Sequence, residues 1–117
     1  MIEKFGIGID IVKISRFEKI KFTEKPSFYK KLFLQSEIKY CLKYKNSSEH
    51  FAGKFAIKEA IKKSIKEQLS FLDIETLNSD LKPSVKLLNK SLNYVFLISL
   101  SHEKEFAVSV VISQKID

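Results

Sequence analysis

Two carboxylates lie in apolar or basic surroundings where an unpartnered carboxylate would be unfavourable. Asp10 interrupts an apolar run over residues 5–14 that is rich in Ile and Val, and Glu59 lies in a long stretch without proline. Burying a carboxylate is costly unless it meets a cation or several hydrogen-bond donors. Mg²⁺ takes one or two protein carboxylates and fills its other positions with water and substrate phosphate oxygens. Asp10 and Glu59 therefore predict a magnesium site and a substrate that carries phosphate groups.

Two basic side chains are candidates to contact that phosphate. Lys63 follows Glu59 by one helical turn, and His102 follows Ser101 at the end of an apolar stretch. Lys63 would act as a compact positive charge and His102 as a hydrogen-bond donor. The chemistry implied is phosphoryl transfer.

Each of these residues also has a purely structural interpretation. A strand aspartate such as Asp10 often accepts hydrogen bonds from backbone amides at a sheet edge. Glu59 and Lys63 have the spacing of an ordinary surface ion pair on a helix, worth about 0.2–0.5 kcal/mol. His102 would be a solvated loop residue, and Arg16 would simply be the one arginine of a lysine-rich chain. Taken as a set, the residues favour the functional interpretation.

Other catalytic classes lack their motifs. The single cysteine, Cys41, and the two histidines do not form a zinc-binding spacing, and no GxxxxGK[ST] phosphate loop is present. Gly6 and Gly8 lack the third glycine and the following helix of a dinucleotide fingerprint. Catalysis by a Ser101 nucleophile with His102 as its base is disfavoured, because adjacent strand residues point to opposite faces.

Local patterns predict the elements that position these residues. The apolar run over 5–14 predicts a buried strand, approached closely by another backbone at Gly6 and Gly8. Residues suited to a helix cap or first turn predict helices that begin near Ser15, Pro26 and Ser36. A long helix is expected over 49–66, after a break at residues 46–48.

The long helix is expected to have an apolar and a charged face. The apolar face comprises Ile57, Ala60, Ile61, Ser64 and Ile65. The opposite, charged face comprises Lys58, Glu59, Lys62, Lys63 and Lys66. Phe51, Ala52, Phe55 and Ala56 extend the apolar character around the first half of the helix. Glu59 is therefore expected at the mouth of a site, where the buried part of the helix meets the charged stripe.

The second half of the chain is expected to form strands. They are predicted over 74–77, 84–88, 94–101 and 106–113, with 81–83 and 102–105 as connections. The last two strands should form a hairpin. This order implies one α+β domain over residues 1–117, in which helices, including one long helix, pack on a mainly antiparallel sheet.

Composition limits the classes of partner and location. The formal net charge of +7 arises from 21 basic and 14 acidic residues, and it predicts an anionic partner: nucleic acid, a phosphorylated ligand or an acidic protein. Arg16 is the only arginine, which argues against a domain that reads bases. With one cysteine, no apolar run of about 18 residues and no signal peptide, the chain is expected to be soluble and cytoplasmic.

Three blocks of sequence carry a joint resemblance to a known family. They are GIGIDIVKISRF at 6–17, FAGKFAIKEAIKKS at 51–64 and ISLSHE at 98–103. The first two are similar to the patterns G-[IL]-G-x-D-[IL]-x-x-x-x-R and F-x-x-[KR]-[FW]-[AS]-x-K-E-[AS]-x-x-K. The third is similar to an S-[ILV]-[ST]-H turn. In order, spacing and chain length they resemble holo-acyl-carrier-protein synthase, the small trimeric bacterial class of phosphopantetheinyl transferase.

The resemblance implies a role for each matching residue. Asp10 and Glu59 match the two Mg²⁺ ligands, and Lys63 matches a lysine near the transferred phosphate. Ser101 and His102 match the coenzyme A pocket, and Lys54 stands at a usually basic position near its nucleotide end. Arg16 matches an arginine that faces the acyl carrier protein, the acidic substrate protein of the family. The neighbouring basic residues complete the surface expected to face it, which comprises Lys13, Arg16, Lys19, Lys21 and Lys25.

The reaction implied by the resemblance uses coenzyme A as co-substrate. A serine hydroxyl of an acyl carrier protein attacks the β-phosphate and adenosine 3′,5′-bisphosphate is released, in support of fatty acid biosynthesis. Glu59 and Asp10, acting through a metal-bound water, are both candidates for the general base. The family is a trimer with active sites between neighbouring subunits, so some of the Phe and Ile content is expected at an interface.

The chain departs from the family pattern at two places. The usual Gly-Lys-Pro turn reads Leu81-Lys82-Pro83, and the usual arginine at position 54 is a lysine, which removes bidentate phosphate recognition. Two other interpretations compete with the enzyme. One is a small basic nucleic-acid-binding domain, which leaves Asp10 and Glu59 unexplained. The other is a non-catalytic module that binds acyl carrier protein, which the intact set of site residues argues against.

Overall fold

The first and last strands of the chain pair in one antiparallel sheet. The computed structural model describes residues 2–79 and 82–117. Its three-stranded sheet has the order β1 (Phe5–Lys13), β5 (Phe106–Lys115) and β4 (Tyr94–His102), and β2 (Ile74–Ser79) pairs with β3 (Lys82–Leu87) in a separate two-stranded sheet. All the pairings are antiparallel, and β4 and β5 pair as the predicted hairpin.

The predicted connection at 81–83 is partly wrong. Lys82 and Pro83 begin β3, where Pro83 pairs with Asn78, and Leu81 lies outside the described residues. A proline is tolerated in such a strand because a two-stranded sheet consists only of edges.

The helices occur where the sequence predicts them. They are α1 (Ser15–Lys19), α2 (Pro26–Leu32), α3 (Gln35–Leu42) and α4 (Ser47–Ser64), with single 3₁₀ turns at Ile2–Lys4 and Phe71–Asp73. The predicted break at 46–48 is partly wrong, because α4 begins at Ser47 and only Asn46 lies outside it. α4 ends two residues earlier than expected, because Ile65 adopts an extended conformation. No helix among residues 2–79 and 82–117 combines the length and apolar character needed to span a membrane.

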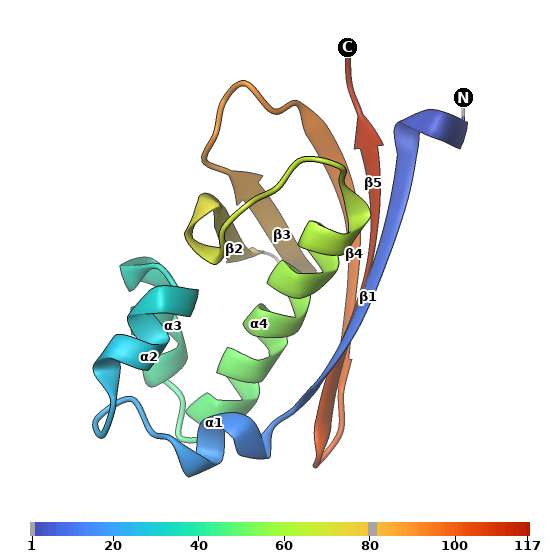
Figure 1. Cartoon of the computed structure of the whole chain (residues 1–117). Coiled ribbons are helices and arrows are strands. Elements are labelled where there is room, and N and C mark those ends of the chain that lie inside the picture. The colour runs from blue at the N-terminus through green and yellow to red at the C-terminus, as the bar shows by residue number, and fades with distance from the viewer. Residues whose placement is uncertain (1, 80–81) are drawn as a thin grey trace.

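Helix α4 packs on one face of the three-stranded sheet (Figure 1). Its closest approach to β1 is at two glycines. A Cβ atom at Gly8 would lie 2.0 Å from the carbonyl oxygen of Ala60, and one at Gly6 would lie 1.7 Å from that of Ser64. The Ser113 hydroxyl of β5 donates a hydrogen bond of 2.7 Å to the same Ser64 carbonyl. The predicted close approach of another backbone to β1 is therefore confirmed.

The short helices enclose an aromatic core around the first half of α4. Phe51 on α4 lies 4.6 Å from the ring of Tyr29 and 5.0 Å from that of Phe33, measured between centroids. The Tyr29 hydroxyl donates to the carbonyl of Phe17 at 3.0 Å, so the polar end of this buried ring is satisfied. A second apolar cluster lies under the other half of α4 and includes Ile57, Ala60, Ile61, Leu69, Ile74 and Val111.

The other face of the three-stranded sheet is apolar and uncovered in the single chain. Ile7 on β1 is 68% exposed and Leu97 on β4 is 71% exposed. The prediction of a buried strand over 5–14 is therefore only half right for one chain, because alternate side chains of β1 point away from α4. The sequence of β1 is continuously apolar because the side chains on both faces of this strand are apolar, although α4 covers only one of the two faces.

Replacing Gly8 by alanine is expected to lower the free energy of unfolding by about 3 kcal/mol or more, because backbone atoms of α4 block the new methyl group. Gly53→Ala is the matched control. Its methyl group would meet the flexible Leu100 side chain at 3.1 Å, and alanine favours a helix interior by about 1 kcal/mol. Urea unfolding followed by circular dichroism measures both variants, and wild-type stability of Gly8→Ala would contradict the packing described.

Candidate active site

Asp10 forms an ion pair within the chain. It follows Gly6 and Gly8 on the side of β1 that faces α4, and its side chain is 13% exposed. Lys63 of α4 donates hydrogen bonds from Nζ to Asp10 Oδ1 at 3.0 Å and to the carbonyl oxygen of Ile9 at 3.1 Å. Strand and helix thus hold an ion pair at the edge of the sheet.

Glu59 projects toward the same edge. It is half-buried and precedes Lys63 by four residues, so both side chains leave the same side of α4. The ordinary surface pair between Glu59 and Lys63 is absent among the described residues, because Lys63 reaches Asp10 instead. The Glu59 carboxylate makes no ion pair within the described part of the chain.

The donor chemistry at this edge fits Mg²⁺. The described residues contain no group of three or more histidine, cysteine or acidic side chains able to hold a metal ion. Two carboxylates on separate elements nevertheless suit a hard ion that draws its remaining ligands from water and phosphate. Ser109, which pairs with Asp10 across the β1–β5 ladder, also has a buried hydroxyl without a hydrogen-bond partner. No pattern in the sequence singles out this hydroxyl, because Ser109 is one small polar residue in an apolar strand.

His102 lies at a small cleft on the opposite edge of the sheet. It is the last residue of β4 and not a turn residue, and its Nδ1 lies 2.6 Å from Oε1 of Glu49. The cleft is bordered by residues from α3, α4, β2 and β4, among them Tyr40, Glu49, His50, Lys54, Asn78 and His102. Burial lowers the pKa of His50 from its ordinary value of 6.5, and its ring stacks on Tyr44 at 3.8 Å.

Lys54 borders this cleft but is bonded within the chain. Only 5% of the residue is exposed, and Nζ donates to the Thr76 carbonyl at 3.2 Å, the Thr76 hydroxyl at 3.1 Å and Asn78 Oδ1 at 2.9 Å. Nζ also lies 4.7 Å from the ring centroid of Tyr40. Burial lowers the pKa of Lys54.

The predicted site residues therefore form two groups within one chain. Asp10 and His102 lie on opposite edge strands with β5 between them, about 10 Å apart across two ladders. Glu59 and Lys54 point about 140° apart around α4, because each residue turns the helix by about 100°. Ser101 lies in neither group, since it is exposed on the face of β4 away from α4.

The expected carrier-facing basic residues lie together along the chain and are exposed. They are Lys13, Arg16, Lys19, Lys21 and Lys25, at the end of β1, on α1 and in the segment before α2. None of the five forms an ion pair with a described residue. The Arg16 guanidinium lies 4.9 Å from the ring centroid of Phe55, which orients it by a cation–π contact.

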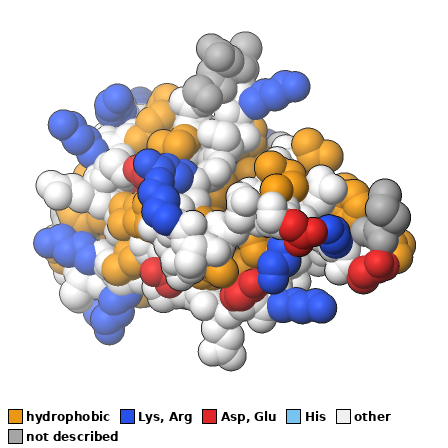
Figure 2. All heavy atoms as spheres, turned by 90° about the horizontal axis from the view of Figure 1, so that it is seen from above, with side chains coloured by type: hydrophobic (Ala, Val, Ile, Leu, Met, Phe, Trp, Pro, Cys, Tyr) orange, Lys and Arg blue, Asp and Glu red, His pale blue; other side chains and the backbone are white. Residues whose placement is uncertain are grey.

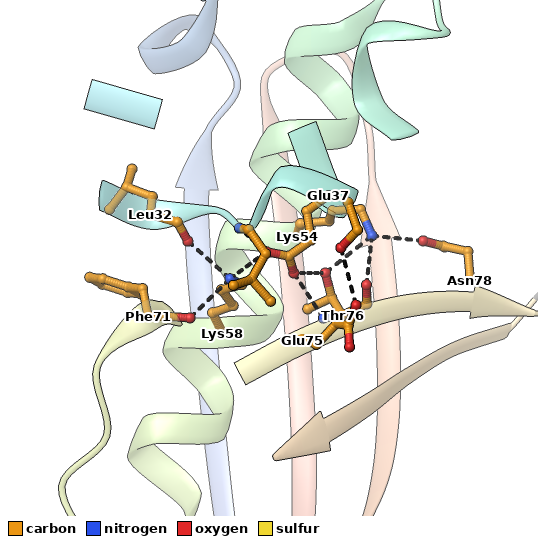
Figure 3. A network of polar contacts seen from close by, with 10 residues as sticks. Leu32, Glu37, Lys54, Lys58, Phe71, Glu75, Thr76 and Asn78 are labelled. Atoms are coloured by element: carbon orange, nitrogen blue, oxygen red, sulfur yellow. Dashed lines mark hydrogen bonds and ion pairs between the residues drawn. The ribbon is translucent and has the colours of Figure 1, made fainter. Parts of the chain in front are cut away.

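The prediction that Lys58 lies on a charged, solvated face is wrong. Its side chain is completely buried and forms a salt bridge of 2.6 Å with Glu37, which is equally buried (Figure 3). Helical spacing does not reveal this, because α3 covers that side of α4 through a contact distant in sequence. Glu37 was predicted only as part of a helix start.

Comparisons with known proteins show which family the chain is similar to. Residues 6–111 match the 4′-phosphopantetheinyl transferase superfamily. The chain is 36% identical to a holo-[acyl-carrier-protein] synthase of Geobacter sp. (strain M21), covering 95% of this chain and 98% of the relative. It is 41% identical to the synthase of Thermodesulfovibrio yellowstonii, covering 92% of this chain and 96% of the relative.

Solved structures of such synthases have the same fold. The synthase of Bacillus anthracis, in complex with CoA (3′,5′-ADP), has a TM-score of 0.79 and 36% identity, covering 95% of this chain and 96% of that chain. The synthase of Helicobacter pylori, in complex with coenzyme A, has a TM-score of 0.74 and 38% identity, covering 92% of this chain and 99% of that chain. The predicted α+β fold is confirmed.

Proposed function

This chain belongs to the holo-[acyl-carrier-protein] synthase family, and on that premise we propose that it transfers 4′-phosphopantetheine from coenzyme A to a serine of apo-acyl carrier protein. Adenosine 3′,5′-bisphosphate is the second product, and the reaction supports fatty acid biosynthesis in the cytoplasm. Residues 1–117 act as one phosphopantetheinyl transferase domain. The observation that carries the proposal is the Asp10–Lys63 pair beside Glu59, at the positions that match the family pattern.

Asp10 and Glu59 are the residues that would hold Mg²⁺. When bound, the ion supplies positive charge that offsets the negative charge of the coenzyme A pyrophosphate. Lys63 adds a second positive charge at the same edge, and its contact with the Ile9 carbonyl fixes its ammonium near Asp10. These groups favour a transition state in which negative charge accumulates on the phosphate oxygens.

The transfer forms one phosphorus–oxygen bond and breaks another. The carrier serine oxygen bonds to the β-phosphorus, and the bond from that phosphorus to the bridging oxygen breaks as adenosine 3′,5′-bisphosphate leaves. The serine proton passes directly or through one water to a carboxylate, for which Asp10 and Glu59 are both candidates. The protein contributes position and electrostatics to this step.

The cleft at His102 is the proposed site for the nucleotide end of coenzyme A. His102 and Lys54 border it, and two synthases with this fold are described with coenzyme A or its nucleotide bound. Within one chain this cleft and the Asp10 edge lie on opposite sides of α4, so a single coenzyme A would need both edges brought together. A neighbouring subunit can supply the second edge.

We therefore propose a homotrimer whose active sites lie between subunits. The uncovered apolar sheet face supports it, because such a face on a monomer marks an interaction surface. Most of the phenylalanines lie in the core, whereas the exposed isoleucines of β1 lie on this face. Ser101 also lies there, where it would approach the coenzyme A of a neighbouring subunit.

The carrier protein is proposed to bind the basic residues Lys13, Arg16, Lys19 and Lys21. An acidic recognition helix on the carrier would complement these exposed cations and accelerate encounter. Basic side chains are also scattered over the end of the molecule that carries the termini (Figure 2), so net charge alone does not select the surface. The α1 region is distinguished by basic residues at every second or third position from the end of β1 onward.

Incubation with coenzyme A, Mg²⁺ and apo-acyl carrier protein is expected to raise the carrier mass by one phosphopantetheine group. Asp10→Asn and Glu59→Gln should each lower kcat/KM by about 100-fold or more, because each removes a negative ligand from the proposed metal site. Glu105→Gln is the control for loss of an exposed carboxylate. Mass spectrometry measures the product, and no mass gain beside an active synthase would contradict the proposed function.

Light scattering is expected to give a particle of about 41 kDa, three times the 13.6 kDa of one chain. Ile9→Lys should reduce that mass to one chain, because it places a charge on the uncovered apolar face. Ile2→Lys, at an exposed apolar residue before β1, is the control and should stay trimeric. A monomeric wild-type protein would contradict the trimer.

Raising the salt concentration is expected to raise KM for the carrier protein and leave KM for coenzyme A less affected, because exposed charges are screened. Lys19→Glu should raise KM for the carrier about tenfold at low salt and weaken its salt dependence. Lys90→Glu changes the net charge equally at an exposed residue far along the chain. Equal effects of the two substitutions would exclude α1 as the carrier surface.

A further inference from the structure

A carboxylate and two ammonium groups are buried together beside α4 (Figure 3). Glu37 comes from α3, and Lys54 and Lys58 come from one side of α4, where they are four residues apart. Burial lowers the pKa of Lys58, and the Glu37 carboxylate opposes that shift. Enclosing this much charge is costly unless nearly every polar atom has a partner.

Glu37 accepts four hydrogen bonds. Oε1 accepts from Lys58 Nζ at 2.6 Å and from the Leu34 amide at 2.7 Å. Oε2 accepts from the Thr76 amide at 2.8 Å and from the Thr76 hydroxyl at 2.5 Å. A single carboxylate therefore joins the start of α3, strand β2 and helix α4.

Lys58 uses its remaining donors on two further segments. Nζ donates to the carbonyl oxygen of Leu32, at the end of α2, at 3.0 Å and to that of Phe71 at 2.9 Å. Thr76 then continues the network to Lys54, because its carbonyl and hydroxyl oxygens both accept hydrogen bonds from Lys54 Nζ. The polar network is thus connected from one end to the other and attaches α4 to four separate parts of the chain.

We propose that Glu37 and Lys58 are positioning residues for Glu59, because their network fixes the rotation of α4 about its axis. The proposal rests on the proposed function, in which Glu59 holds the metal opposite Asp10. Lys58 precedes Glu59 directly, so any rotation permitted at Lys58 is transmitted to Glu59. A rotation of 10° moves a group about 6 Å from the axis by about 1 Å.

Other contacts of α4, such as those of Lys63 with Asp10 and of Ser64 with Ser113, lie on the β1 and β5 side, whereas the network holds the side that faces α3 and β2. At the closest approach to β1 the contacts are made by Gly6 and Gly8, which have no side chains to interlock with the helix. Glu59 itself has no ion-pair partner in the described part of the chain. A misplacement of about 1 Å at reacting groups can cost about 10²-fold in rate.

A buried ion pair contributes little net stability compared with an apolar pair, although removing one partner is strongly destabilising. Replacing both partners, in place of one, can therefore distinguish a role in positioning Glu59 from a role in folding. Lys58→Met leaves an unneutralised carboxylate and is expected to lower the thermal midpoint. Adding Glu37→Gln removes that charge. The single amide oxygen of glutamine can accept from only one of the Leu34 and Thr76 amides, so the double variant should recover part, and not all, of the lost midpoint.

The test measures metal affinity and transfer in the Lys58→Met/Glu37→Gln protein. With coenzyme A present, Mn²⁺ binding followed by electron paramagnetic resonance should weaken about tenfold or more, and kcat should fall by at least as much. Lys62→Met is the matched control, because Lys62 lies 3.9 Å from the Phe71 ring centroid but outside the network. It should retain wild-type Mn²⁺ affinity and kcat.

A folded double variant with wild-type Mn²⁺ affinity and kcat would overturn the positioning role. If the double variant does not fold, Thr76→Val provides a milder change that removes one donor from Glu37 and should weaken Mn²⁺ binding about threefold. Unchanged affinity in folded Thr76→Val would then overturn the role. Wild-type protein that binds Mn²⁺ but transfers nothing would contradict the proposed function alone, and absence of Mn²⁺ binding would contradict both.

Discussion

The direct contact between the backbones of α4 and β1 is the constraint on which the rest of the structure depends. Two glycines allow the helix to lie against the strand without intervening side chains. The next residue on that side of β1, Asp10, is then within reach of Lys63. Any larger residue at Gly8 would lift the helix and separate the carboxylates that the proposed chemistry needs together.

This contact determines the distance between α4 and β1. The buried charges on the other side of α4 are proposed to determine the rotation of the helix about its axis. The aromatic core gives the helix a large apolar contact, but apolar contacts are not directional. Hydrogen bonds at Glu37 and Lys58 are directional and each has a defined partner. A structure that must hold a carboxylate to a fraction of an ångström combines both kinds of interaction.

Much of the fold, and the residues proposed for the site, could be predicted from the sequence for physical reasons. Asp10 was singled out because a charge in an apolar run contrasts with its neighbours, and Glu59 because it lies where the apolar and charged faces of the long helix meet. Lys58 was misplaced for the converse reason, since it lies in a run of charged residues and only a contact with α3 buries it. The sequence of β1 is apolar on both faces. That pattern is the same whether the second face is covered by the same chain or by another molecule, so the uncovered face could not be predicted. The separation of His102 from Asp10 follows from strand order, which residue patterns do not specify.

The uncovered apolar sheet face has a consequence for how much enzyme works at a given abundance. If three chains complete each other's sites, the assembled fraction follows mass action and falls steeply on dilution. A newly made chain would then be inactive until it meets its partners, and its unprotected face would be an aggregation hazard in the meantime. Specific activity per chain would therefore depend on the protein's own concentration, which links the supply of modified carrier protein to the rate at which this chain is made.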